Sequence, residues 1–130
     1  MTIKFFVDEN LTSRVNEIVK ALDMEHVDTL RVTCMRSRGS GARRTIARCY
    51  ALSRIWQLAL GIKAHYIIEI ISERFDKLSM EEQDKVIIHE LSHIPFSFGG
   101  GFKHHGNWVT KNRVDSLYQL YKIKKEEKEF

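Results

Sequence analysis

The stretch "HYIIEIISERFDKLSMEEQDKVIIHELSHIP", residues 65–95, contains the clearest strand and the clearest helix start in the chain. Its first eight residues, His65 to Ser72, are mostly β-branched or aromatic, and Glu69 is their one charge. Such a run predicts a β-strand. The remainder begins with a turn and continues as an amphipathic segment that carries two histidines.

A helix is predicted directly after that turn. Ser79 and Glu82 have the S-x-x-E spacing of a capping box, in which each side chain bonds the other residue's backbone N–H. Pro95, the only proline in the chain, cannot continue a helix and disfavours helical geometry at the preceding residue. We therefore predict a helix from Ser79 to about His93 or Ile94.

Upstream of residue 65, the pattern favours further strands. The segment Val27 to Met35 is rich in β-formers, and Thr45 to Tyr50 forms a second such segment. The turn residues Arg38 to Gly41 lie between them, so we predict a β-hairpin with an arginine-bearing tip. Ile55 to Leu60 is predicted as a third short strand.

Two further helices flank this region. Apolar residues between Leu11 and Leu22 recur at helical spacing, and Asn10 or Thr12 could cap that helix. A second stripe predicts a helix from about Asn107 to Lys125. Its last residues and the rest of the chain, Lys122 to Phe130, are nearly all charged, so we expect this tail to fray.

The composition is that of a soluble globular protein: 130 residues, 43% hydrophobic and 29% charged. No linker or repeat divides residues 1–130, which predicts a single domain. No apolar run approaches the ~20 residues of a membrane span. The N-terminus, Met1 to Val7, lacks the pattern of a signal peptide, so we expect a cytoplasmic protein. Cys34 and Cys49 lack metal-motif spacing and are interpreted as free thiols.

Positive charge is concentrated in one segment. The formal net charge is +4, and the seven arginines from Arg31 to Arg54 have no acidic residue among them. Such a block can contact phosphates, an acidic peptide or nucleic acid. The alternative is an exposed strand pair that arginine keeps soluble.

The helix predicted from Ser79 carries the sequence His89-Glu90-Leu91-Ser92-His93. Residues four apart lie on one helix face, so His89 and His93 can bind one metal ion. Glu90 lies on the flank of that face, where it can act as general base for a metal-activated water and later protonate the leaving amine. Zinc is the metal that this H-E-x-x-H pattern predicts.

A catalytic zinc also needs a third protein ligand. The metzincin pattern places a glycine three residues and a histidine six residues after the second motif histidine. Phe96 and Gly99 occupy those positions, which excludes that family.

His104 and His105 follow a glycine-rich loop, Phe98 to Gly101, that we expect to be mobile and able to bring the chain back to the site. Either histidine can supply the third ligand. A glutamate, Glu69 or Glu73, is the less favoured alternative.

The stretch from residue 65 to 95, followed by "GGGFKHHG", resembles the small metallopeptidases of archaea and phages, which are similar to the SprT-like zinc proteases. The resemblance extends from about Val32 to Tyr121. It implies an α+β fold: a compact zincin-like domain of minimal gluzincin type, with a small, mostly antiparallel sheet and an active-site helix packed on it.

The resemblance also implies a set of site residues. His89 and His93 would bind zinc together with a histidine after the loop, and Glu90 would be the catalytic base. The family's third histidine precedes a glycine or small polar residue, which matches His105, before Gly106, better than His104.

The implied substrate is a protein or peptide. Zincins bind extended substrates along an edge strand, for which Tyr66 to Ser72 or Ile55 to Leu60 are candidates. SprT-like relatives act on proteins crosslinked to DNA, so the arginine-rich hairpin becomes a candidate DNA contact, through Arg36, Arg38, Arg43 and Arg44.

Two other functions fit the same motif. One is a nucleic-acid-binding module whose zinc site is structural or catalytically silent. Against it, structural zinc usually has four protein ligands, often cysteine, and Glu90 would have no role. The other is metal-dependent hydrolysis of a bond other than a peptide bond.

Overall fold

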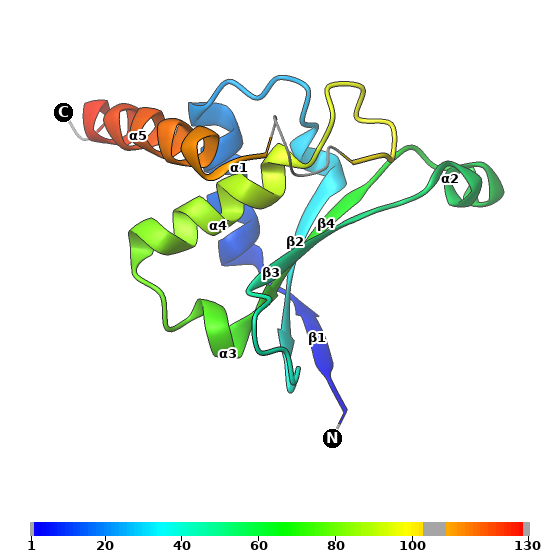
Figure 1. Ribbon diagram of the computed structural model, residues 1–130. Coiled ribbons are helices and arrows are strands. Elements are labelled where there is room, and N and C mark those ends of the chain that lie inside the picture. The colour runs from blue at the N-terminus through cyan, green and yellow to red at the C-terminus, as the bar shows by residue number, and fades with distance from the viewer. Residues whose placement is uncertain (1, 103–108, 129–130) are drawn as a thin grey trace.

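The computed structural model describes residues 2–102 and 109–128, which form an α+β fold around one mixed sheet (Figure 1). The strands stand in the order β1-β2-β4-β3. Their bounds are β1 Lys4–Val7, β2 Val32–Arg38, β3 Ala47–Ala51 and β4 Tyr66–Ile71.

The expected strand at residues 65–72 is confirmed as β4, and it occupies an interior position. It pairs parallel with β2 and antiparallel with β3, and β1 pairs antiparallel with β2. The sheet is thus mostly antiparallel, as expected, with one parallel pair. The predicted β2–β3 hairpin is wrong, because β4 lies between these two strands.

The reason is that β4 is buried on both faces except at Ile67, which is 37% exposed. Ile68 and Ile70 are fully buried on one side, and Glu69 and Ile71 are buried on the other. A strand of this kind is stable only between two neighbours. The connection from residue 39 to 46 is long enough to cross the ~10 Å between β2 and β3.

The helices are α1 Glu9–Ala21, α2 Arg54–Leu60, α3 Ser72–Phe75, α4 Met80–Ser92 and α5 Lys111–Glu127, with a short 3-10 turn at Thr29–Arg31. Helices α1, α3, α4 and α5 gather on one side of the sheet, whereas α2 lies apart from them (Figure 1). The other face of the sheet exposes apolar side chains, among them Phe5, Val7, Tyr50 and Ile67. Across the described ranges, no helix has both the length and the apolar character needed to cross a membrane.

The N-terminal region differs from the prediction in two ways. Strand β1 was not predicted, and helix α1 is capped by Asp8 rather than by Asn10 or Thr12. The Asp8 carboxylate accepts a hydrogen bond from the Leu11 backbone N–H at 2.9 Å. The four residues of β1, Lys4–Val7, are all exposed, so they lack the alternation of buried and exposed positions that would predict a strand.

The segment Ile55 to Leu60, predicted as a strand, is helix α2. Gly61 ends it in the left-handed conformation, at φ 67°, which glycine adopts without strain. Gln57 is its one buried residue, and Ile55 and Trp56 are 75% and 58% exposed. The apolar residues of α2 do not alternate with polar ones, as they would in a strand with one face against a core.

Helix α4 is tied to the rest of the molecule through a buried ion pair. The Arg14 guanidinium of α1 lies 2.7 Å from the Asp84 carboxylate of α4, and it also donates to Gln83 at 2.9 Å. Ile87, Ile88 and Leu91 on the same helix are fully buried in the core. The position of α4 against the sheet is therefore held by both packing and charge.

Two smaller expectations are also resolved. Cys34 and Cys49 are free thiols, Cys34 buried and Cys49 half-buried. Helix α5 begins after its cap Thr110 and remains helical to Glu127, beyond Lys122, where we expected fraying to begin.

Candidate metal centre

The predicted helix start is confirmed, and it fixes the orientation of the candidate ligands. The Ser79 hydroxyl accepts from the Glu82 N–H at 3.2 Å, and the Glu82 carboxylate accepts from the Ser79 N–H at 3.3 Å. Helix α4 then runs without interruption to Ser92, with His93 as its C-cap. His89 and His93 consequently lie one turn apart on the same face.

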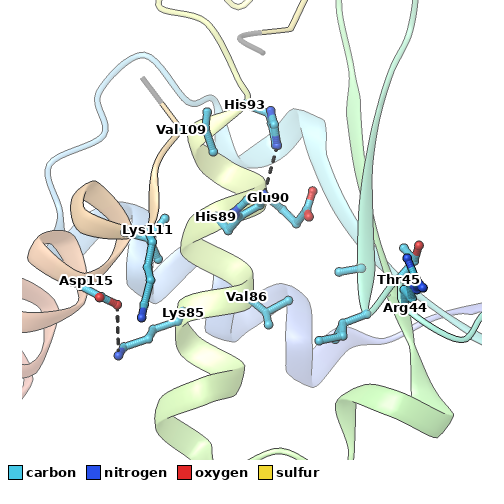
Figure 2. Close-up of a pocket in the computed structure, with 13 residues that line it drawn as sticks. Arg44, Thr45, Lys85, Val86, His89, Glu90, His93, Val109, Lys111 and Asp115 are labelled. Atoms are coloured by element: carbon cyan, nitrogen blue, oxygen red, sulfur yellow. Dashed lines mark hydrogen bonds and ion pairs between the residues drawn. The ribbon is translucent and has the colours of Figure 1, made fainter. Parts of the chain in front are cut away.

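The two imidazoles face each other. The Nε2 atoms of His89 and His93 are 3.3 Å apart, and the rings are tilted at 70° to each other (Figure 2). Two nitrogens bound at ~2.0–2.1 Å to a tetrahedral zinc ion lie about 3.3 Å apart. The observed separation therefore fits two ligands of one such ion.

Glu90 lies beside the histidine pair and points from α4 toward the side of the cleft where Arg44 and Thr45 lie (Figure 2). Its side chain is buried, with 8% of the residue exposed, and no described residue donates a hydrogen bond to its carboxylate. Burial raises the pKa of Glu90 to about 7, because desolvation disfavours the charged form. A cation placed near the histidines would favour the ionised carboxylate.

These three residues form part of the floor of a cleft of about 820 Å³. One wall is the segment that leads into β3, and the other is the start of α5 (Figure 2). Apolar side chains make up much of the lining, and charged ones stand among them. Besides the motif residues, it is lined by Arg44, Thr45, Ile46, Ala47, Lys85, Val86, Val109, Lys111, Val114 and Asp115.

Strand β3 is an edge of the sheet next to this cleft. The Ile71 N–H donates to the Ile46 carbonyl, and the Leu52 N–H donates to the His65 carbonyl. In an antiparallel pair, hydrogen-bonded and non-hydrogen-bonded positions alternate. The backbone groups of residues 47, 49 and 51 therefore face away from β4, along the free edge.

The strands that we expected to provide this edge do not. Tyr66–Ile71 is enclosed between β2 and β3, and Ile55 to Leu60 is helical. The residues that do form the edge, Ala47–Ala51, were predicted as part of the hairpin. Their edge position follows from the strand order.

The glycine-rich loop after Pro95 is held at three points. The Tyr66 hydroxyl accepts from the Gly100 N–H at 3.0 Å and donates to the Gly101 carbonyl at 2.9 Å. The Gln57 amide donates to the Gly99 carbonyl at 3.0 Å and to the Leu52 carbonyl at 2.8 Å. These contacts fix the part of the loop that the structure describes, which we expected to be mobile.

Sequence reasoning missed Tyr66 and Gln57 as residues that support the site. Both lie more than 30 positions from the loop that they bind, so no local pattern links them to it. The available signal was weak: a glutamine in an otherwise apolar run, and a tyrosine at the start of a buried strand.

The candidate third ligands have different outcomes. His104 and His105 lie outside the described residues. Glu69 accepts hydrogen bonds from Ser37 and Tyr50, each at 2.6 Å, and Glu73 accepts from the Gly39 N–H. Within residues 2–102 and 109–128, no three histidine, cysteine or acidic side chains form a metal-binding group, so neither glutamate completes the site.

The arginine block does not form a single surface. Arg36 is mostly buried and paired with Asp8 and Asp76, at 2.6 and 2.8 Å. The Arg38 guanidinium lies over the Phe6 ring, 5.7 Å from its centre. Arg43 and Arg44 are exposed in the connection before β3. The charge of Arg36 is therefore already compensated within the fold.

A family model described as "Putative phage metallopeptidase" matches residues 3–126. The match includes helix α4 with both histidines and Glu90, the β3 edge and most of α5. Searches among curated proteins and among solved structures gave no significant match.

Proposed function

The chain belongs to the phage metallopeptidase family, and on that basis we propose that it is a single-domain, zinc-dependent enzyme that hydrolyses peptide bonds. The observation that carries the proposal is the 3.3 Å separation of the His89 and His93 Nε2 atoms beside Glu90. An α+β fold with this helix against the sheet is consistent with a minimal zincin-like domain.

In this proposal His89 and His93 hold the metal, and Glu90 handles protons. Zinc would polarise the scissile carbonyl and lower the pKa of a water molecule at that position. Glu90 accepts a proton from the attacking water and returns it to the leaving amine. Glu90 lines the cleft while only 8% of the residue is exposed, which places its carboxylate where a water bound in the cleft can reach it.

His105 is proposed as the third ligand, with His104 as the alternative. The described part of the loop supports a ligand from this segment, because Tyr66 and Gln57 fix its course as far as Gly101. Substituting each histidine separately by alanine and measuring bound zinc distinguishes them. Loss of zinc from neither variant would exclude this assignment.

The substrate is proposed to bind as an extended strand along β3. The free edge offers the backbone groups of residues 47, 49 and 51, and the cleft beside it receives the neighbouring side chains. Strand addition of this kind uses main-chain hydrogen bonds for affinity and pockets for selectivity. It would place the scissile bond above the histidine pair.

The decisive experiment compares wild type with Glu90→Gln for zinc content and for cleavage of an unfolded protein. We expect both to retain zinc and only the wild type to cleave. Glu81→Gln, an exposed change on the same helix, is the matched control and should retain activity. Bound zinc with no cleavage by the wild type would contradict the proposal and favour a nucleic-acid-binding module.

The similarity to SprT-like proteases suggests that the substrates include DNA-associated proteins. Arg38 and Arg43 are the arginines that we propose for DNA contact, since Arg36 is paired inside the fold and Arg44 lines the cleft. Reversing both charges should weaken DNA binding and reduce its salt dependence. Unchanged affinity and salt slope would remove DNA from the proposal.

A further inference from the structure

The cleft carries more positively than negatively charged side chains, and the H-E-x-x-H motif does not explain this excess. Among the residues that the structure describes, three cations line it, Arg44, Lys85 and Lys111, together with one carboxylate other than Glu90, that of Asp115. The Lys85 amine lies 3.2 Å from the Asp115 carboxylate, so these two charges balance each other. Lys85 also lies over the Tyr118 ring, 5.3 Å from its centre, which holds it on the α5 side.

Arg44 and Lys111 remain uncompensated. Both are exposed, and among residues 2–102 and 109–128 neither side chain has an ion pair or hydrogen bond. They stand on opposite walls, Arg44 before β3 and Lys111 at the start of α5 (Figure 2). A peptide lying in the cleft would therefore have a cation on either side.

The rest of the lining favours a peptide over other anions. Ile46, Ala47, Val86, Val109 and Val114 make much of the surface apolar. Apolar side chains offer nothing to a phosphate backbone, whereas a peptide supplies apolar and acidic side chains together. Concave sites with one sign of charge also raise the local concentration of oppositely charged ligands.

We infer that Arg44 and Lys111 determine substrate specificity: they select peptides with an acidic side chain close to the scissile bond and disfavour lysine or arginine there. The inference rests on the proposed peptidase function and names its substrate class. Lys85 contributes less, because Asp115 already neutralises it.

The test uses internally quenched peptides with a common apolar core and glutamate, glutamine or lysine at one varied position near the cleaved bond. For the zinc-loaded wild type we expect kcat/KM to fall in the order Glu, Gln, Lys, with about a tenfold Glu-to-Lys ratio at low salt. The ratio should shrink as ionic strength rises. A ratio near one at every position would overturn the inference.

Two double variants test whether Arg44 and Lys111 themselves, rather than the net charge of the protein, determine the preference for glutamate over lysine. In the Arg44→Gln/Lys111→Gln double variant the Glu-to-Lys ratio should approach one. The Lys77→Gln/Lys122→Gln double variant removes the same total charge at exposed positions outside the cleft and should keep the wild-type ratio. An unchanged ratio in the first variant, or an equal loss in both, would overturn the assignment.

A binding measurement tests the same preference for acidic peptides without depending on catalysis. Zinc-loaded Glu90→Gln protein should bind the glutamate peptide about tenfold more tightly than the lysine peptide, and short duplex DNA should not displace it. Equal affinities, or displacement by DNA alone, would contradict the inference. Cleavage of all peptides at equal rates defeats only this inference, whereas zinc binding without any cleavage defeats the peptidase proposal.

Discussion

The Tyr66 hydroxyl accepts a hydrogen bond from the Gly100 N–H at 3.0 Å, so a residue at the start of the interior strand supports the loop that follows the candidate metal-binding helix. The same hydroxyl donates to the Gly101 carbonyl at 2.9 Å. The ring packs against Phe98, with 4.8 Å between the ring centres. One side chain thus joins the centre of the sheet to the chain that leads toward His104 and His105.

Tyr66→Phe should therefore weaken metal binding without removing any candidate ligand. The ring contacts remain, but the part-buried Gly100 N–H and the Gly101 carbonyl lose their partner, which costs about 1 kcal/mol of unfolding free energy. We expect zinc affinity to fall about tenfold, as for other residues that support ligands indirectly. Competition with a chromogenic chelator measures the affinity. Tyr50→Phe, whose hydroxyl binds Glu69, is the control, and an equal loss of affinity there would contradict the prediction.

Gly100→Ala should be much more damaging than Gly101→Ala. Gly100 has φ 105°, and an added Cβ would stand 2.5 Å from the Gln57 amide nitrogen and 2.6 Å from the Leu52 carbonyl oxygen. We expect a loss of at least about 2 kcal/mol in urea unfolding, from backbone strain and displacement of Gln57. At Gly101 nothing lies within 4 Å of the added atom, so that variant should be close to neutral. Equal stability of the two variants would contradict this account of the loop.

Asp84→Ala should destabilise the fold far more than Asp115→Ala. Asp84 is 3% exposed, and removing it leaves the Arg14 guanidinium in a mostly buried position without its carboxylate partner. Breaking such a pair costs about 3–5 kcal/mol. Asp115 pairs with Lys85 at the surface, where the cost should stay below about 1 kcal/mol. Denaturant titration of both variants measures the difference, and similar midpoints would contradict it.

Asp8 should make stability depend on pH in the acid range. Burial opposes its ionisation, but hydrogen bonds from the Leu11 N–H and from Arg36 outweigh this, so the pKa of Asp8 is below its ordinary value of 3.8. A lowered folded-state pKa contributes stability that is fully present above 3.8 and is lost as pH falls through the folded-state value.

The matching variant is Asp8→Asn, which retains a good N-cap but removes the charge. Urea unfolding measured between about pH 3 and 6 should give free energies of unfolding for wild type and variant that converge toward the acid end of the range. A constant difference between the two free energies of unfolding across that range would show that the ionised carboxylate does not provide the stability.

Local signals in the sequence predicted the elements that bear the candidate site. The capping box, the i, i+4 histidines and the proline stop all act within helix α4 or next to it, so their geometry follows from helix periodicity alone. Strand β4 was equally clear as a strand, because its residues are mostly β-branched or aromatic, but its interior position was not predicted, since we expected it to supply an edge.

The errors concern information that is not local. The order β1-β2-β4-β3 depends on which strands can bury both faces, and adjacency in the sequence suggested a hairpin instead. In α2 a six-residue apolar run is compatible with either a strand or a helix, and Gly61 was the only local sign of a helix end. The roles of Arg36 and Gln57 depend on partners 28 to 42 positions away.

The interior position of β4 also has a consequence for biosynthesis. The other three strands leave the ribosome first; β2 can pair with β1, but β3 has no neighbouring strand and the sheet stays open until residues 66–71 follow. Only the short helix α3 separates β4 from α4, so the last strand of the sheet and the histidine-bearing helix are made in close succession. The interior of the sheet and the helix that bears the candidate metal ligands are therefore completed together, from one continuous stretch of chain.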